Sequence, residues 1–184
     1  FHCVHMSEED ISIFKSRGLT AVLNPASNLK LASGIAPVKR FLDEGIAIAV
    51  GTDGAGSNNA LDMFREMYLV SVLAKYREGD ASAVDAAKVL KAACVGGARA
   101  MGLDTCDGIA AGKKADLAVI DLKRPNMRPI NNIAKNIVYA GSKENVRMTM
   151  VDGKILYEDG QFFMDEDPLD VYRQTAKIIE RMEA

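Results

Sequence analysis

Mainly apolar runs of strand length occur at residues 1–5, 19–23 and 46–50. Continuous apolar runs are typical of strands that are buried on both faces of a parallel sheet. Helical signals lie around them: Ser7 precedes an acidic turn as an N-cap, and Pro37 stands at the first turn of another helix. The alternation predicts βα units around a parallel sheet, with an opening strand at residues 1–5.

Two longer helical segments follow. The first has an apolar face at helical spacing that we expect to pack on the core, formed by Leu61, Phe64, Tyr68 and Val72. The second is rich in alanine, and we expect it to run from an N-cap at Ser82 to about Cys94 and to be interrupted at Gly96-Gly97.

Beyond Asp107 the pattern becomes that of strands. Runs at residues 116–121 and 146–151 predict strands, and Asp152-Gly153 predicts a tight hairpin. Asp167-Pro168 then predicts the start of a terminal helix. Its apolar residues are expected to face inward, namely Val171, Ile178, Ile179 and Met182.

Composition and charge narrow the class of protein. The chain has 23 Lys and Arg against 25 Asp and Glu, a net charge of −2, which argues against a strongly basic nucleic-acid binder. Its 48% hydrophobic content is that of a globular protein, and no apolar stretch approaches the ~18 residues of a membrane span. The cysteines (Cys3, Cys94 and Cys106) lack CxxC spacing, so we expect neither a disulfide framework nor a zinc knuckle, and we predict a cytoplasmic protein.

Asp53 is the main candidate for chemistry. It directly follows the run at residues 46–50, in a loop with Gly51 and Gly54. The carboxyl ends of parallel strands open into a common crevice, where a carboxylate can hold a cation and accept a proton from metal-bound water. The alternative is a turn or helix cap, but Asn58 and Asn59 lie nearer to the next helix, which favours a functional Asp53.

His2 is the second candidate, because it lies in the predicted opening strand. Residues three apart on a strand face opposite sides, so His2 and His5 cannot both reach the crevice, and His5 is expected to be structural. A lone histidine is more often a hydrogen-bonded structural residue than a catalyst. By composition alone, the segment 24–28 is a simple turn, and Cys3 is a small buried apolar residue.

Three motifs, in this order, resemble the amidohydrolase superfamily: Phe1-His2-Cys3-Val4-His5, Asn24-Pro25-Ala26-Ser27-Asn28-Leu29-Lys30-Leu31 and Gly51-Thr52-Asp53-Gly54. The segment from Gly108 to Leu117 resembles the strands by which that superfamily returns to its small β-sandwich. The sequence is most similar to the branch of 5-methylthioadenosine/S-adenosylhomocysteine deaminases and related aminohydrolases and chlorohydrolases.

The resemblance implies a fold and a set of domains. It implies an α/β chain that forms the C-terminal part of a (β/α)₈ TIM-type barrel, about three βα units, with strands of a small β-sandwich and a C-terminal helix. We place the barrel part at residues 1–106, the sandwich strands at 107–164 and the helix at 165–184.

The resemblance also implies an active site with one divalent metal ion, zinc or iron. Asp53 matches the family's aspartate metal ligand, which also shuttles a proton, and His2 matches a sixth-strand histidine beside the attacking hydroxide. Ser57 and Asn28 lie where family members shape the substrate pocket.

The sequence lacks the family's HxH pair and the His-x-x-Glu motif, and it starts within an apolar run without Met. We therefore expect a fragment, inactive alone, of an adenosine-type deaminase whose partners are a nucleoside substrate and the missing N-terminal half. No nucleic-acid or membrane partner is expected, and a homo-oligomer is left open. The alternatives are a guanine deaminase, a triazine chlorohydrolase or a non-catalytic βα binding domain.

Overall fold

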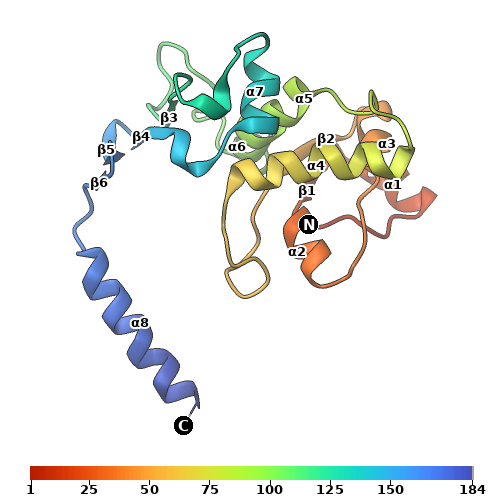
Figure 1. Ribbon diagram of the computed structural model, residues 1–184. Coiled ribbons are helices and arrows are strands. Elements are labelled where there is room, and N and C mark those ends of the chain that lie inside the picture. Colours follow the sequence, from red (N-terminus) through yellow and green to blue (C-terminus); the bar gives the residue numbers. More distant parts are fainter. Residues whose placement is uncertain (184) are drawn as a thin grey trace.

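Two parallel strands lie at the centre of the N-terminal part of the computed structural model, which describes residues 1–183 (Figure 1). They are β1 (Thr20–Leu23) and β2 (Ala47–Val50), paired from Thr20 with Ala47 to Leu23 with Val50. Both predicted apolar runs are therefore strands.

The predicted opening strand is wrong. Residues 1–7 form no helix or strand, and His2 and Cys3 have φ of 64° and 52°. This left-handed conformation is incompatible with an extended strand. One backbone bond still fixes the segment beside β1, because the His2 N–H donates to the Val22 carbonyl at 2.8 Å. Cys3 is buried in the core, as expected.

Three short helices surround the strand pair: α1 (Glu8–Ser16), α2 (Pro25–Lys30) and α3 (Val38–Asp43). Ser7 caps α1 through a reciprocal pair of bonds with Asp10, which confirms the predicted start. The helix α2 replaces the simple turn expected at residues 24–28. It begins at Pro25, because proline fits the first helical position as well as it fits a turn.

The helix α4 (Met63–Glu78) packs on the core with a different face from the predicted one. Tyr68 is exposed, and Leu61 lies before the helix and is exposed as well. Its buried residues are Glu66, Met67, Val70, Ser71 and Ala74. Two of these buried residues are polar. A prediction from apolar residues alone therefore places the buried face at the wrong angle around the helix axis.

The alanine-rich segment is one continuous helical run. It comprises α5 (Ala86–Lys91), a π-helical turn η1 (Ala92–Gly96) and α6 (Gly97–Ala100). Asp85 caps it in place of Ser82, whose N–H and hydroxyl both donate to Asp80. The glycine pair does not interrupt it.

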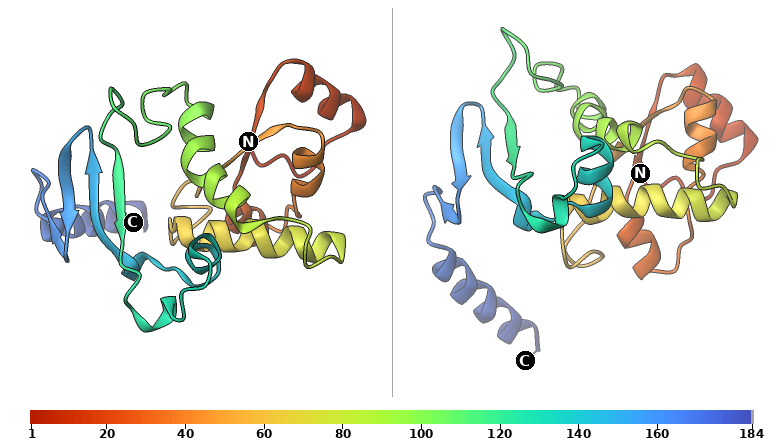
Figure 2. Two further views of the ribbon diagram at one scale, coloured as in Figure 1. Left: turned by 90° about the horizontal axis from the view of Figure 1, so that it is seen from above. Right: turned by 45° about the horizontal axis from the view of Figure 1, so that its top comes forward.

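A separate antiparallel sheet follows, which Figure 2 shows beside the helical part. Its order is β3 (Leu117–Ile120), β4 (Val146–Val151), β5 (Lys154–Glu158) and β6 (Gln161–Phe162). The predicted hairpin at Asp152-Gly153 joins β4 to β5. Between β3 and β4 lie short 3₁₀ turns, η2 (Pro125–Met127) and η3 (Lys143–Asn145), and the helix α7 (Ile133–Ala140), which packs on α4 and α5.

The terminal helix α8 (Pro168–Glu183) extends away from the rest of the molecule (Figure 1). Its start at Pro168 is as predicted, but its apolar residues do not face inward. Val171, Ile178, Ile179 and Met182 are all exposed.

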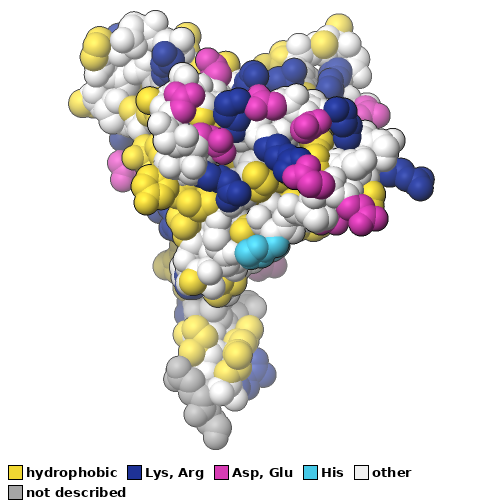
Figure 3. Space-filling model, turned by 90° about the vertical axis from the view of Figure 1, so that its right-hand side faces the viewer, with side chains coloured by type: hydrophobic (Ala, Val, Ile, Leu, Met, Phe, Trp, Pro, Cys, Tyr) yellow, Lys and Arg dark blue, Asp and Glu magenta, His cyan; other side chains and the backbone are white. Residues whose placement is uncertain are grey.

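Charges of both signs are mixed on the face that carries α1 and α3 (Figure 3). Ion pairs join these elements there: Lys15 with Glu44 at 2.9 Å, and Arg40 with Glu8. Among the described residues, no helix combines the length and apolar character needed to cross a bilayer.

Candidate functional site

The site lies where β1 and β2 end. The Gly51 N–H donates to the Leu23 carbonyl at 2.9 Å and carries the parallel pairing one step beyond β2. The chain then turns sharply, since Asp53 has φ of 60°. Left-handed backbone at a residue other than glycine is strained and is found disproportionately at functional sites. The turn directs the Asp53 carboxylate back toward α2.

Ser27 on α2 holds this carboxylate. The Ser27 side chain is fully buried, and its hydroxyl donates to Asp53 Oδ2 at 2.6 Å. The Gly54 N–H donates to the other oxygen, Oδ1, at 2.7 Å. The Ser27 hydroxyl above all, then the Ser57 hydroxyl and the Gly54 N–H, lower the pKa of Asp53 to about 2. Asp53 is therefore anionic at neutral pH.

His2 approaches the same carboxylate from the far side of β1. Its Nδ1–H donates to Asn28 Oδ1 at 2.8 Å, which leaves the Nε2 lone pair free in this tautomer. Nε2 lies 3.9 Å from Asp53 Oδ2. The helix α2 thus orients both groups, Asp53 through Ser27 and His2 through Asn28.

The structure brings the predicted residues His2, Asp53 and Asn28 together in one cluster. Ser57 lies on the same loop as Asp53 and donates to the Gly54 carbonyl at 3.1 Å. His5 lies apart from the cluster, where its Nε2 contacts the Ser33 carbonyl at 3.1 Å. The contact of Asn28 and Ser57 with a substrate stays a prediction.

Two supporting residues were missed, Ser27 and Glu66. Ser27 lies within a segment that reads as a turn, so nothing marked it as buried. Glu66 is fully buried on α4, and the available signal was a carboxylate next to Met67 in the core-facing phase of the helix. The N-cap of α4 is neither Asn58 nor Asn59, the two residues that the sequence favoured for this role. Asp62 caps it by accepting from the Phe64 N–H, while Asn58 donates to Glu66.

The donor atoms suit a borderline divalent cation in kind. A carboxylate oxygen and a neutral imidazole nitrogen are both common zinc ligands. The Asp53 carboxylate is ionised, and its hydrogen-bond donors are a hydroxyl and a backbone N–H rather than Lys or Arg. Within residues 1–183, however, no group of three or more His, Cys, Asp or Glu side chains could hold a metal ion. Asp53 therefore fits the role of one ligand among several.

Comparison with known proteins gives consistent matches. The model of the amidohydrolase family matches residues 1–156. The 5-methylthioadenosine/S-adenosylhomocysteine deaminase 1 of Syntrophus aciditrophicus is 42% identical over 180 residues, which are 96% of this chain and 41% of that protein. The 5'-deoxyadenosine deaminase of Methanosarcina acetivorans is 42% identical over 176 residues, 95% of this chain and 40% of its own length.

Solved structures match as well. An adenosine deaminase from Xanthomonas campestris with bound zinc superposes with a TM-score of 0.93 at 36% identity, over 99% of this chain and 42% of that one. The zinc-bound atrazine chlorohydrolase of Arthrobacter aurescens gives a TM-score of 0.84 at 24% identity, over 95% of this chain and 39% of its own, a likeness of fold alone. The chain spans about two fifths of the length of the curated relatives that it matches.

Proposed function

Given that this chain belongs to the amidohydrolase family, we propose that the whole protein is a metal-dependent aminohydrolase that removes the ring amino group of an adenosine-type nucleoside. The observation that carries the proposal is the pair formed by Asp53 and His2 at the strand ends, with the carboxylate held ionised by Ser27. The substrates for which the relatives are named support 5-methylthioadenosine, S-adenosylhomocysteine and 5'-deoxyadenosine as substrates here.

Each residue of the cluster has a role in this proposal. Asp53 contributes one oxygen ligand to a zinc or iron ion, which when bound supplies a water molecule of lowered pKa. Hydrolysis forms a C–O bond at the ring carbon and breaks its C–N bond, so a proton must pass from water to the departing ammonia. The second Asp53 oxygen accepts and returns that proton. His2 in its protonated form, with Nδ1–H on Asn28, donates its Nε2–H to the ring carbon's new oxygen and stabilises the charge that develops there.

Asn28 and Ser57 complete the pocket in this proposal. Asn28 fixes the imidazole through Nδ1 and presents the correct Nε2 edge. Ser57 lies at the turn of the loop that holds Asp53, and its hydroxyl would turn from the Gly54 carbonyl to a substrate group. Both therefore act at the rim of the cluster rather than at the reacting atoms.

We place this chain in the whole protein as follows. Residues 1–106 form the last βα units of a TIM-type barrel, residues 107–164 strands of a β-sandwich and residues 165–183 a closing helix. Ala184, the last residue of the predicted helical range, lies outside the described residues. The remaining metal ligands and the acid that protonates the ring come from the rest of the protein. In this proposal the substrate is a small nucleoside and the enzyme is cytoplasmic. The proposal leaves the oligomeric state open.

The test is a substrate panel with the whole purified protein. Ammonia release is measured from 5-methylthioadenosine, S-adenosylhomocysteine, 5'-deoxyadenosine, guanine and an amino-triazine, with zinc or with iron and after chelation. We expect release from the adenosine-type compounds alone, lost on chelation and restored by metal. Turnover of guanine or the triazine only would assign a different amidohydrolase. A protein that takes up no added metal and turns over none of the compounds would indicate a binding domain.

A further inference from the structure

A buried carboxylate lies behind the site, on the first turn of α4. The Glu66 side chain is fully buried and accepts two hydrogen bonds. Its Oε2 accepts from the Ala26 N–H at 3.0 Å, and its Oε1 accepts from Asn58 Nδ2 at 2.7 Å. Each carboxylate oxygen thus contacts a different segment of the chain.

These two segments are the ones that hold the site. Ala26 is the second residue of α2 and directly precedes Ser27, the donor to Asp53. Asn58 closes the loop that carries Asp53, and its Nδ2 also donates to the Thr52 carbonyl at 2.7 Å. Glu66 therefore connects α2, through Asn58, to Thr52, the residue that precedes Asp53.

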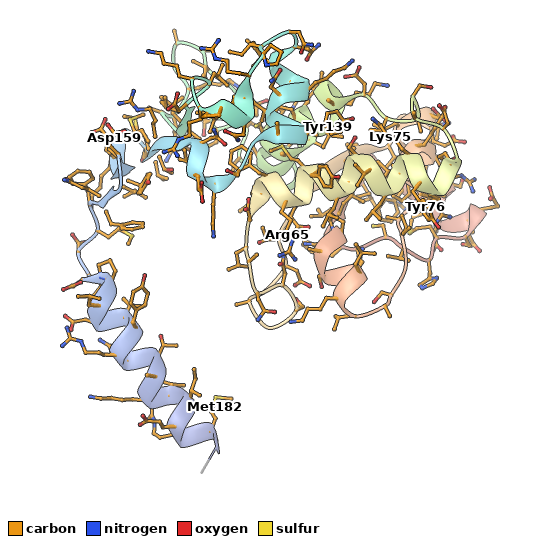
Figure 4. All side chains as sticks on the ribbon, in the orientation of Figure 1. Arg65, Lys75, Tyr76, Tyr139, Asp159 and Met182 are labelled. Atoms are coloured by element: carbon orange, nitrogen blue, oxygen red, sulfur yellow. The ribbon has the colours of Figure 1, made fainter. Side chains whose placement is uncertain are left out.

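The Asn58 amide is itself held in orientation. Arg65 Nη2 donates to Asn58 Oδ1 at 3.2 Å, which directs the amide nitrogen toward Glu66 and Thr52. Figure 4 shows Arg65 reaching from the start of α4 toward the loop. The donors and acceptors along Arg65, Asn58 and Glu66 alternate, so the orientation of each group follows from its neighbour.

Core packing does not account for a carboxylate at this position. A buried charge is costly to desolvate, and burial raises the pKa of Glu66. Its neighbours on the buried face include Met67 and Val70, and an apolar side chain would fill the same space. Capping of α4 does not need it either, because Asp62 accepts from the first backbone N–H groups. What remains specific to Glu66 is the joint between the two segments.

We propose that Glu66 is a positioning residue for catalysis: it sets the distance between α2 and the Asp53 loop and so keeps Ser27, Asp53 and His2 in register. The expected fall in kcat rests on the proposed function, whereas the expected link between α2 and the Asp53 loop does not. A displacement of catalytic groups by about 1 Å costs on the order of 10²-fold in rate, so the joint matters even though Glu66 touches no reacting atom.

Glu66→Gln in the whole metal-loaded protein tests the joint, with Glu78→Gln at the exposed end of the same helix as control. A glutamine can accept with one oxygen only, and its amide nitrogen must face the other donor. We expect kcat to fall at least about tenfold with KM changed less than about threefold, while Glu78→Gln changes neither. A kcat that falls only in proportion to the unfolded fraction, measured by thermal melting, would overturn the proposal.

Hydrogen exchange of the metal-free whole protein gives a readout that needs no substrate. Glu66→Gln is expected to increase amide exchange in residues 25–30 and 51–62 together, and Asn58→Ser in residues 51–62 alone. Exchange that is unchanged in both segments, or raised evenly over the whole chain, would refute the joint. If the wild-type protein deaminates nothing, the proposed function fails, while the exchange experiment still decides the role of Glu66.

Discussion

At the scale of single residues, the Asp53 carboxylate is the group with the most directed donors in the site. Ser27 and Gly54 each donate to one of its oxygens. In the whole protein, Asp53→Asn is expected to abolish turnover and weaken metal retention, because the amide is neutral and accepts a proton poorly. Ammonia release and bound metal measure the two effects. Near-normal rate with full metal content would contradict the assignment, and the melting temperature should stay close to that of the wild type.

His2 is expected to act on charge rather than on metal retention. His2→Ala should lower kcat by roughly 10² or more while most of the metal is retained, because the proposed role of His2, 3.9 Å from Asp53, is to stabilise charge in the transition state. The comparison of kcat with metal content by atomic absorption checks this. Should metal and rate be lost in equal proportion, His2 would be a ligand.

The Ser27 hydroxyl gives the site a defined pH dependence. Together with the Ser57 hydroxyl and the Gly54 N–H, it lowers the pKa of Asp53 from 3.8 to about 2. The stability gained from these bonds to the ionised carboxylate is therefore complete above pH 3.8 and is lost as the pH falls through about 2. In Ser27→Ala the pKa of Asp53 should rise toward 3.8, as followed by NMR of the carboxyl carbon in metal-free protein. The stability difference between the two proteins should shrink over the same pH window. An unchanged pKa would show that Ser27 does not control this group.

Sequence patterns locate the candidate groups for chemistry better than the residues that hold them. Asp53 could be chosen because it follows a predicted strand, and His2 because it stands in a motif that resembles a known family, although the strand predicted around it is wrong. Ser27 could not, because its burial follows from a helix that begins where Asn-Pro indicates a turn. The role of Glu66 depends on Ala26 and Asn58, which lie 40 and 8 residues away, and no local pattern encodes such contacts.

At the scale of elements, the π-helical turn η1 packs unusually close to β2. A Cβ at Gly96 would lie 2.3 Å from the Ile48 carbonyl oxygen, whereas a Cβ at the adjacent Gly97 meets nothing within 4 Å. Gly96→Ala should therefore destabilise the fold by about 1–3 kcal/mol, and Gly97→Ala should stabilise it by about 0.5–1 kcal/mol through helix propensity. Urea unfolding of both variants measures the contrast. Equal effects at the two positions would mean that η1 does not approach β2 so closely.

Two predictions from local signals were correct, whereas the N-cap expected at Ser82 lies at Asp85. The capped start of α1 and the Asp152-Gly153 hairpin need only neighbouring residues to form. The failures depend on tertiary contacts: the buried face of α4 contains the polar Glu66, and the opening segment is bent by left-handed residues although it is apolar. Position in the fold, rather than propensity, decides these cases.

At the scale of the whole molecule, large apolar side chains remain uncovered in the chain as it stands. On α8 alone Leu169, Tyr172 and Met182 are 60%, 66% and 81% exposed. We expect the isolated 184-residue chain to self-associate, to bind less than one equivalent of zinc or iron, and to release no ammonia from the nucleosides. Light scattering and metal analysis, with and without the rest of the protein, check this. A monomer with one bound metal and turnover would contradict the prediction.

The helix α4 also bears on how such proteins can be recombined. Its first turn carries Glu66, behind the candidate site, and further along the helix Ser71 Oγ and Lys75 Nζ lie 2.8 Å and 2.5 Å from the Tyr139 hydroxyl of α7 (Figure 4). A chimera that takes its antiparallel sheet from a relative should therefore be joined after Ala140, so that α7 stays with the α4 of its own parent. A junction before Ile133 would pair α4 with a foreign helix, and the mismatch would be carried along one helix to the loop of Asp53.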